Sequence, residues 1–312
     1  MSDIHLYPLS KAKNNPSAAI FHLWNRNLKH DFPISKRLLN QNLLDHPLLD
    51  LNRSFLAFAG KKLVGFLMAK KHPSGKKVWI SAMLVERDFQ RKGIGSRLLL
   101  AFEEKLSSDA EILIGTDPGH LFPGLPDEKA ETIRFFSQKG YKVEGNAFDL
   151  IANISAYHPK YELDEKYTAR RLREEEKENL LFLIKKNFSL RWYEDTVTLL
   201  EREGSVRGTM GLFKEGSLIG FAHTYSFQED GLGPSVYWKG LLGEKYGGLG
   251  PIGVAKAYQG KGLGTAFFEK IVLSLQQDGV EDMVVDWTIL LSYYGKFGFQ
   301  PWKKYVHAKK II

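Results

Sequence analysis

The sequence predicts an α/β protein built from two domains with the same order of elements. The chain has 312 residues, which is more than one domain usually contains. A short glycine-spaced phrase occurs twice, as QRKGIG at Gln90–Gly95 and as QGKGLG at Gln259–Gly264. Predicted strands and helices follow in the same order around both copies, so the repeat extends over most of the chain.

The composition is that of a globular protein with sizeable cores. Hydrophobic residues make up 43% of the chain and charged residues 26%, which is typical of folded domains. There is no cysteine, which excludes disulfides, thiolate nucleophiles and cysteine-ligated metals, and which fits a cytoplasmic protein. The start of the chain lacks a signal-peptide pattern, and apolar runs such as LLFLI are too short to span a membrane.

The net charge of +8 comes from basic residues that are scattered along the chain. A nucleic-acid-binding protein normally gathers such residues in one patch or stripe, so we expect no nucleic-acid partner. A modest positive surface also suits a phosphorylated cofactor. The histidines show no metal-ligand spacing, so we expect no metal, and His223 is expected to be a packed or an edge histidine on a strand.

Each half opens with a strand, at Ile4–Leu9 and at Tyr167–Leu172, and two helical stretches follow. Two apolar runs joined by a polar turn then predict a hairpin around Gly60 and another around Gly216. The front ends of the two halves thus agree in pattern, although they share few letters.

The glycine phrase joins a strand to a helix in both halves. The strands are expected at Val78–Val85 and Gly248–Val254. Apolar residues after each phrase recur at helical spacing, and Gly279 ends the second run. A further strand begins at Glu111 and at Asp282, and a second helix then ends in the related phrases RFFSQKGYKVEG and SYYGKFGFQPW.

The first half carries an extra segment, PGHLFPGLPDE, that the second half lacks. Its prolines stiffen it, and Leu121 and Phe122 are expected to pack inward. It either walls an acceptor pocket or packs against the other half, and we favour the second interpretation. The domains are predicted at 1–155 and 166–312, joined by a polar, proline-containing linker at 156–165.

Glycines between a strand and a helix favour phosphate binding by the backbone. The first N–H groups of a helix lack intrahelical partners, the helix dipole attracts anions, and glycine lets a ligand approach closely. The loop lacks the ending of a Walker P-loop and the third glycine of the dinucleotide fingerprint. It therefore predicts a phosphate site of another kind.

Both phrases resemble the signature Q/R-x-x-G-x-G/A of the GNAT superfamily, the acyl-CoA-dependent N-acetyltransferases. The resemblance covers both halves, so the chain is similar to a tandem GNAT protein. It implies in each half a mixed, mostly antiparallel sheet, flanked by helices and splayed between its fourth and fifth strands to admit coenzyme A. It also implies acetyl-CoA as cofactor, with the pyrophosphate on the glycine loop and the pantetheine arm along the fourth strand.

The residues that the resemblance assigns to the cofactor lie in the two loops and at the ends of the preceding strands. In the first half they are Val85, Gln90, Arg91, Lys92, Gly93, Ile94, Gly95 and Ser96, with Leu84 beside them. In the second half they are Gly253, Val254, Gln259, Gly260, Lys261, Gly262, Leu263, Gly264 and Thr265.

Many GNAT enzymes protonate the departing thiolate from a tyrosine in a Y-x-K-x-G-F/Y phrase. Tyr294 fits this phrase, and a phenol with an ordinary pKa of about 10 stays protonated at neutral pH. Phe136 stands at the matching place in the first half and has no proton to give. We therefore expect the second domain to be catalytic and the first to be non-catalytic. Asp286 and Glu244 are the candidate general bases, each able to relay the amine's proton through water.

The function implied is transfer of an acetyl group from acetyl-CoA to a primary amine, by direct attack in a ternary complex. The residues leave the acceptor open between a small-molecule amine and the amine of a peptide or protein, and they leave the oligomeric state open. One alternative is an acyl-CoA sensor without catalysis. Another is an aminoacyl-tRNA-dependent transferase, which the positive charge permits but the intact pyrophosphate loops argue against.

Overall fold

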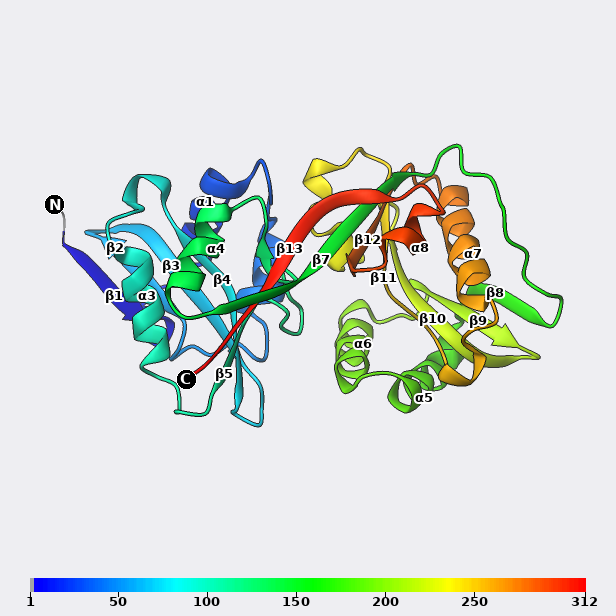
Figure 1. Cartoon of the computed structure of the whole chain (residues 1–312), viewed down its shortest axis with the longest axis horizontal. Coiled ribbons are helices and arrows are strands. Elements are labelled where there is room, and N and C mark those ends of the chain that lie inside the picture. The colour runs from blue at the N-terminus through cyan, green and yellow to red at the C-terminus, as the bar shows by residue number, and fades with distance from the viewer. Residues whose placement is uncertain (1–2) are drawn as a thin grey trace. The chain divides into compact units, whose positions relative to one another are not determined.

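The computed structural model describes residues 3–312 (Figure 1). The chain divides into two compact units. The first unit runs up to Ala147 and also contains Lys304–Ile312, and the second contains Phe148–Lys303. Both units combine a sheet with flanking helices, as the sequence predicts.

The first unit follows the predicted order of elements. Its strands are β1 (Ile4–Pro8), β2 (Phe55–Ala59), β3 (Lys62–Lys71), β4 (Lys77–Val85), β5 (Glu111–Ile114), β6 (Leu125–Pro126) and β13 (Gln300–Ile311). Its helices are α1 (Ser17–Leu28), α2 (Lys36–Leu39), α3 (Ile94–Glu103) and α4 (Ala130–Gln138). The strand order is β1-β2-β3-β4-β5-β13, antiparallel throughout except for the parallel pair β4–β5.

The second unit repeats this plan. Its strands are β7 (Lys142–Asn153), which begins in the first unit, β8 (Tyr167–Arg171), β9 (Thr209–Lys214), β10 (Ser217–Ser226), β11 (Tyr246–Val254) and β12 (Asp282–Thr288). Its helices are α5 (Lys177–Asn187), α6 (Leu190–Glu203), α7 (Leu263–Gln277) and α8 (Leu291–Gly295). The strand order is β7-β12-β11-β10-β9-β8, and only β11–β12 is parallel.

Each unit completes its sheet with a strand from the other half of the sequence. In the first unit β13 pairs with β5, with Lys309 opposite Leu113. In the second unit β7 pairs with β12, with Leu150 opposite Val285. The units therefore divide elsewhere than at the predicted 155 and 166, which assume that each half keeps its own last strand. Ladder hydrogen bonds are made by the backbone, so either last strand can satisfy either partner.

Helices cover both faces of the second unit's sheet, and Figure 1 shows α7 on one side of β10 and α5 with α6 on the other. Leu212 and Ala222 pack in the core formed with α7. Their neighbours Phe213 and Phe221 pack in the core formed with α5 and α6. This is the period of two that a strand imposes on its side chains. The sheet is thus buried on both faces, and the glycine loop lies at the end of β11.

The segment predicted as a linker, 156–165, is a fixed part of the second unit. Glu269 of α7 is fully buried and accepts three hydrogen bonds from this segment. The donors are the Tyr157 hydroxyl at 2.6 Å and the backbone N–H groups of Lys160 at 2.6 Å and Tyr161 at 2.8 Å. A buried carboxylate with three donors is well satisfied, so the segment is held along the helix.

The helices of the two units are short. The longest, α7, has 15 residues, whereas a bilayer span needs about 20 apolar residues. Within residues 3–312 no helix has both the length and the apolar content to cross a membrane.

Candidate active site

The two glycine loops have the same backbone conformation. The residue before each helix is a glycine in the left-handed region, Gly93 with φ 78° and Gly262 with φ 74°. Two residues earlier the chain is left-handed again, at Arg91 with φ 60° and at Gly260 with φ 78°. Side chains avoid this region and glycine does not, so the second loop is the less strained of the two.

The glutamine that opens each phrase braces the loop. Gln259 Nε2 donates to the carbonyl oxygen of Val254 at 2.8 Å, and Gln90 Nε2 donates to that of Val85 at 3.0 Å. Each bond ties the loop back to the end of the preceding strand. These amides therefore help to hold the shape of the loop, and their predicted contact with the cofactor stays a prediction.

The space above both loops is open. A Cβ atom built on Gly93, Gly260, Gly262 or Gly264 would meet no atom within 4 Å. The first N–H groups of a helix have no intrahelical acceptors, which applies here to Leu263 and Gly264. The N–H of Thr265 donates to the carbonyl oxygen of Gly262 at 3.0 Å. The geometry suits an anion such as a pyrophosphate.

A cavity of about 580 Å³ borders the second loop. Its lining contains four lysines, Lys160, Lys166, Lys261 and Lys296, and two acids, Glu162 and Asp164. Asp164 forms an ion pair with Lys166 at 2.9 Å, so the lysines outnumber the acids by two. Gly262 and Thr265 form its wall on the side of the helix. The positive charge around the N-terminus of α7 strengthens the attraction for a polyanionic ligand.

In the second unit, the strands part beside the loop and Asp286 fills the gap. The parallel pairing ends at Leu249 opposite Val285. The side chain of the next residue, Asp286, presses on β11: a Cβ atom built on Gly250 would lie 1.8 Å from its Oδ1 atom. This oxygen is buried and, within residues 3–312, has no hydrogen-bond partner.

Burial gives Asp286 an unusual acidity. It raises the pKa of this carboxyl to about 8, with a further contribution from the neighbouring carboxyl of Asp149. The Arg191 guanidinium acts in the opposite direction but is outweighed. A carboxyl with such a pKa holds a proton up to about neutral pH and can exchange it there.

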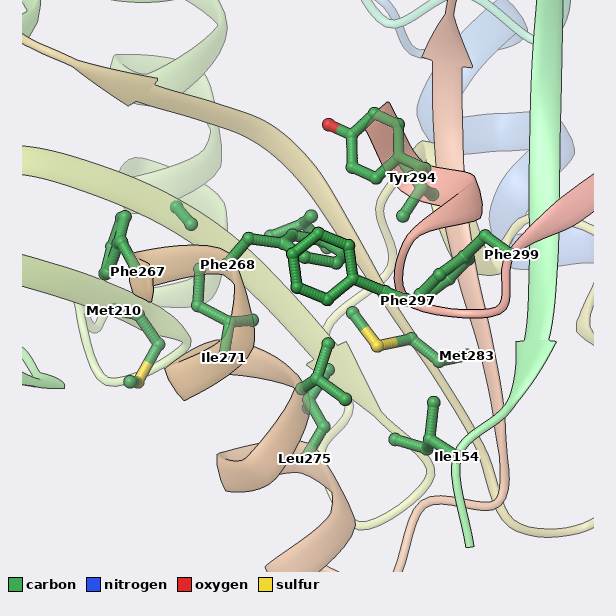
Figure 2. Close-up of a cluster of buried hydrophobic side chains, with 14 of the residues drawn as sticks. Ile154, Met210, Phe267, Phe268, Ile271, Leu275, Met283, Tyr294, Phe297 and Phe299 are labelled. Carbon is green, nitrogen blue, oxygen red and sulfur yellow. The ribbon is translucent and has the colours of Figure 1, made fainter. Parts of the chain in front are cut away.

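Tyr294 lies close enough to Asp286 to be affected by its charge. It is 5% exposed, and its ring packs edge-on against Phe268 at 5.0 Å and Tyr293 at 4.9 Å. Figure 2 shows its hydroxyl group pointing away from the rings of Phe268 and Phe297. Burial, with smaller contributions from Tyr293 and Asp286, raises the pKa of Tyr294 above its ordinary value, so the phenol is protonated at neutral pH.

The other predicted residues of the second unit are spread more widely. Glu244 is exposed in the connection before β11, at the end of that strand remote from the loop. Gly253 faces the ring of Phe188, which a Cβ atom there would approach to 2.4 Å. His223 is buried between Thr196 and a second threonine, and burial lowers its pKa to about 4, so it is a neutral core residue as expected.

The first unit has an open cavity where the second unit has Asp286. The strand registers make Gly115 the counterpart of Asp286 and Ser81 the counterpart of Gly250. Without a side chain at Gly115, a cavity of about 500 Å³ remains. Its lining includes Leu84, Gln90 and Phe136 as well as Ser81, whose buried Oγ atom has no hydrogen-bond partner within residues 3–312.

The insertion of the first half forms a wall of this cavity. Phe122 lines it and packs parallel to Trp24 at 5.9 Å and edge-on to Phe32 at 5.0 Å. Its carbonyl oxygen lies so close to Gly115 that a Cβ atom there would be only 2.3 Å away. The insertion also packs on Tyr305 of β13, a strand from the second half of the sequence. The segment thus forms the wall of a cavity within the first unit and contacts a strand that comes from the second half of the sequence.

Two residues of the site escaped the sequence analysis. Asp149 lies in β7, which the repeat assigns to the first half, yet its carboxyl stands beside Asp286. Arg191 begins α6, far from both glycine phrases. No motif marks either residue, and only the exchange of last strands brings Asp149 to this place.

Comparisons with known proteins identify the family and the fold. The sequence profile described as "Acetyltransferase (GNAT) family" matches residues 18–119 and 162–299, which is more than half of the chain. The chain therefore belongs to the GNAT family of acetyltransferases. No curated protein sequence matches it. Within residues 3–312 no cluster of three or more acidic, histidine or cysteine side chains could hold a metal ion.

Several solved structures share the fold along almost the whole chain. One is described as a GCN5-related glucosamine N-acetyltransferase region in a fungal multi-domain GH3 β-N-acetylglucosaminidase, with TM-score 0.85, 22% identity, and coverage of 99% of this chain and 38% of that one. This chain thus spans well under half of that protein.

Two other structures match with a TM-score of 0.68 and 14% identity. The first is a GCN5-related N-acetyltransferase from Sphaerobacter thermophilus, and the match covers 98% of this chain and 95% of that one. The second is a tandem GNAT protein from the clavulanic acid biosynthesis pathway, and the match covers 99% of this chain and 98% of that one. These likenesses establish the tandem fold and no more.

Proposed function

We propose that the chain transfers an acetyl group from acetyl-CoA to a primary amine, and that the second unit performs the reaction. The observation that carries this proposal is that Asp286, where β11 and β12 part beside an open glycine loop, lies near enough to Tyr294 for its charge to affect the phenol. A base and an acid next to a phosphate site are the parts that transfer from a thioester requires.

In the proposed reaction Asp286 takes a proton from the acceptor's ammonium group. The neutral amine then attacks the thioester carbonyl, so that the new C–N bond forms and the C–S bond breaks. Tyr294 gives its proton to the departing sulfur and recovers one from the nitrogen. Asp286 releases its proton to water, which leaves one proton as product besides the amide and the thiol.

The cofactor residues of the second unit divide into two groups. The N–H groups of Gly262, Leu263 and Gly264 would hold the pyrophosphate, with Lys261 and Thr265 beside it. Val254 and its neighbours in β11 would border the pantetheine arm. Glu244 fits the role of base less well than Asp286, because it is exposed at the remote end of β11.

The first unit is proposed to bind acyl-CoA without turnover. Its loop has the same conformation and its cavity lies between the parted strands. However, Phe136 replaces the tyrosine and Gly115 replaces the acid, so it lacks both proton-transfer groups. This assigns to one unit the sensor function that was considered for the whole protein.

For the acceptor, we propose a small-molecule amine and place amino sugars first in a screen. The support is the 0.85 TM-score to a region described as a glucosamine N-acetyltransferase. Peptide and protein amines remain in the screen as the second class.

Calorimetry with acetyl-CoA tests the cofactor part. Gly264→Glu adds a carboxylate where the phosphates would sit, and the backbone there needs no positive φ, so the helix should form normally. Gly264→Ala is its matched control, because it adds a methyl group and no charge. Gly95→Glu places the same charge in the first unit, where its Cβ atom would be in van der Waals contact with the side chains of Met83 at 3.4 Å and Phe135 at 3.6 Å.

We expect Gly264→Glu to abolish one of two binding sites and all amine acetylation, followed by mass spectrometry of the products. Gly264→Ala should keep both. Absence of acetyl-CoA binding by the wild-type protein would refute the proposal. Turnover that survives Gly264→Glu but not Gly95→Glu would move the active site to the first unit.

A further inference from the structure

Asp149 lies next to Asp286, the proposed base, and takes no part in the reaction proposed above. It is 5% exposed, in the part of β7 that pairs with β12. Its Oδ1 atom accepts a hydrogen bond from the backbone N–H of Trp287 at 3.1 Å. Trp287 has φ 40°, so the chain turns sharply just after Asp286 and directs this N–H toward Asp149. The two carboxyls therefore belong to one local structure.

The charged and titratable groups around Asp286 come from four elements. Asp149 comes from β7, Arg191 from α6, Tyr225 from β10 and Tyr294 from α8. The two tyrosines carry protons at neutral pH, since burial raises the pKa of each. The balance of charge therefore depends on two carboxyls and one guanidinium.

The guanidinium is shared with other groups. Arg191 lies over the ring of Trp287 at 4.5 Å and forms an ion pair with Asp195 at 3.3 Å. Its effect on Asp286 is outweighed by burial and by the carboxyl of Asp149, and two carboxyls held close together out of water do not both ionise readily. One of them then keeps a proton at a pH where an isolated carboxyl has lost it.

We propose that Asp149 is a positioning residue for this base: its buried charge makes the two carboxyls hold one proton between them and keeps Asp286 basic enough to take a proton from an ammonium acceptor. The inference rests on the proposed function of the second unit. An ordinary carboxylate is a poor acceptor for a proton from an ammonium group, because their acidities differ by several powers of ten. Asp149 reduces that difference by making Asp286 more basic.

Asparagine is the informative replacement for Asp149. Its side-chain oxygen can still accept the hydrogen bond from the Trp287 N–H, while its charge is removed. A purely structural Asp149 would therefore tolerate this change. The matched control is Glu281→Gln, which removes an exposed carboxylate at the start of β12 that is paired with Lys245.

The test is a titration of protein carrying ¹³C in the aspartate carboxyl groups, followed by NMR. In the wild type we expect one carboxyl to titrate near pH 8, and its signal should be missing in Asp286→Asn. In Asp149→Asn that midpoint should fall by about one pH unit or more, and in Glu281→Gln it should stay. An unchanged midpoint in Asp149→Asn overturns the inference.

A second measurement uses the wild-type protein alone, in case Asp149→Asn does not fold. The Asp149 carboxyl should show an inflection at the pH where Asp286 titrates, because coupled groups report each other's ionisation. A single inflection at each carboxyl, at unrelated pH values, contradicts the pairing.

The pH profile of kcat/KM separates this inference from the proposed function. We expect the rise of kcat/KM with pH to move to lower pH in Asp149→Asn and not in Glu281→Gln. Acetylation with an unchanged profile overturns the role of Asp149 and leaves the acetyltransferase function standing. If no amine is acetylated although acetyl-CoA binds, the proposed function fails, and the role of Asp149 in transfer fails with it.

Discussion

The hydroxyl group of Tyr293 donates a hydrogen bond to the backbone carbonyl of Gly264, at 3.0 Å. This bond ties α8 to the first turn of α7, beside the open glycine loop. The next residue, Tyr294, lies near Asp286 instead. Two adjacent tyrosines therefore have different partners: Tyr293 supports the glycine loop, and Tyr294 is the residue proposed for proton transfer.

Tyr294→Phe should lower kcat by about 100- to 10,000-fold, the usual contribution of a general acid. Acetyl-CoA affinity should stay within a few-fold of the wild type, because the ring still fills the pocket against Phe268. Release of the free thiol measures the first quantity and calorimetry the second.

Tyr293→Phe is the control for that experiment. It removes the hydrogen bond to Gly264 and should weaken acetyl-CoA binding more than it lowers kcat. If Tyr293→Phe abolishes turnover while Tyr294→Phe leaves it intact, the general acid is Tyr293.

Asp286→Asn should make the free energy of unfolding less dependent on pH. The folded-state pKa of Asp286 is raised to about 8, well above that of an unfolded aspartate, so the folded state binds more protons between about pH 4 and 8. The contribution of Asp286 to the free energy of unfolding is therefore fully present below about pH 4 and is lost as the pH rises toward 8.

The loss amounts to at most about 1.4 kcal/mol per pH unit in that window. Urea denaturation measures this effect. Between pH 6 and pH 8 the free energy of unfolding should fall by about 2 to 3 kcal/mol more in the wild type than in Asp286→Asn. Parallel declines of the two proteins would show that Asp286 titrates at an ordinary pH.

Glu269→Gln should loosen the segment at 156–165. The carboxylate accepts bonds from three donors, and an amide in its place turns its NH₂ group toward at least one of them. We expect a loss of about 1 to 3 kcal/mol in urea denaturation and faster proteolysis near Lys160. Glu281→Gln, at an exposed ion pair, should change stability by less than about 1 kcal/mol.

Lys70→Met should destabilise the first unit by about 3 to 5 kcal/mol. Lys70 and Asp117 are fully buried and form an ion pair at 2.6 Å. Burial alone would raise the pKa of Asp117, but the Lys70 ammonium holds it below its ordinary value. Removing the lysine leaves the buried Asp117 carboxylate without the positive charge of the ammonium group beside it. In thermal unfolding, the double variant with Lys70→Met and Asp117→Asn should recover much of the stability that Lys70→Met loses. A double variant as unstable as Lys70→Met would contradict this account.

Local physics made much of the fold predictable from the sequence. The glycine before each helix, the apolar repeat after it and the polar turn of each hairpin depend on neighbouring residues, and the structure contains all three. The internal repeat then predicted one half from the other. The loop, and β11 with its parting from β12, follow the expected plan.

The sequence by itself determined two domains of one design, the family and the place of the glycine loop, because those depend on short-range spacing and on repetition. Only the tertiary structure decided which last strand completes each sheet, since backbone ladders do not distinguish β7 from β13. That choice brings Asp149 to Asp286 and Tyr305 to Phe122. The charge of the proposed base and the wall of the first unit's cavity therefore come from residues far away in the chain, where no local pattern could announce them.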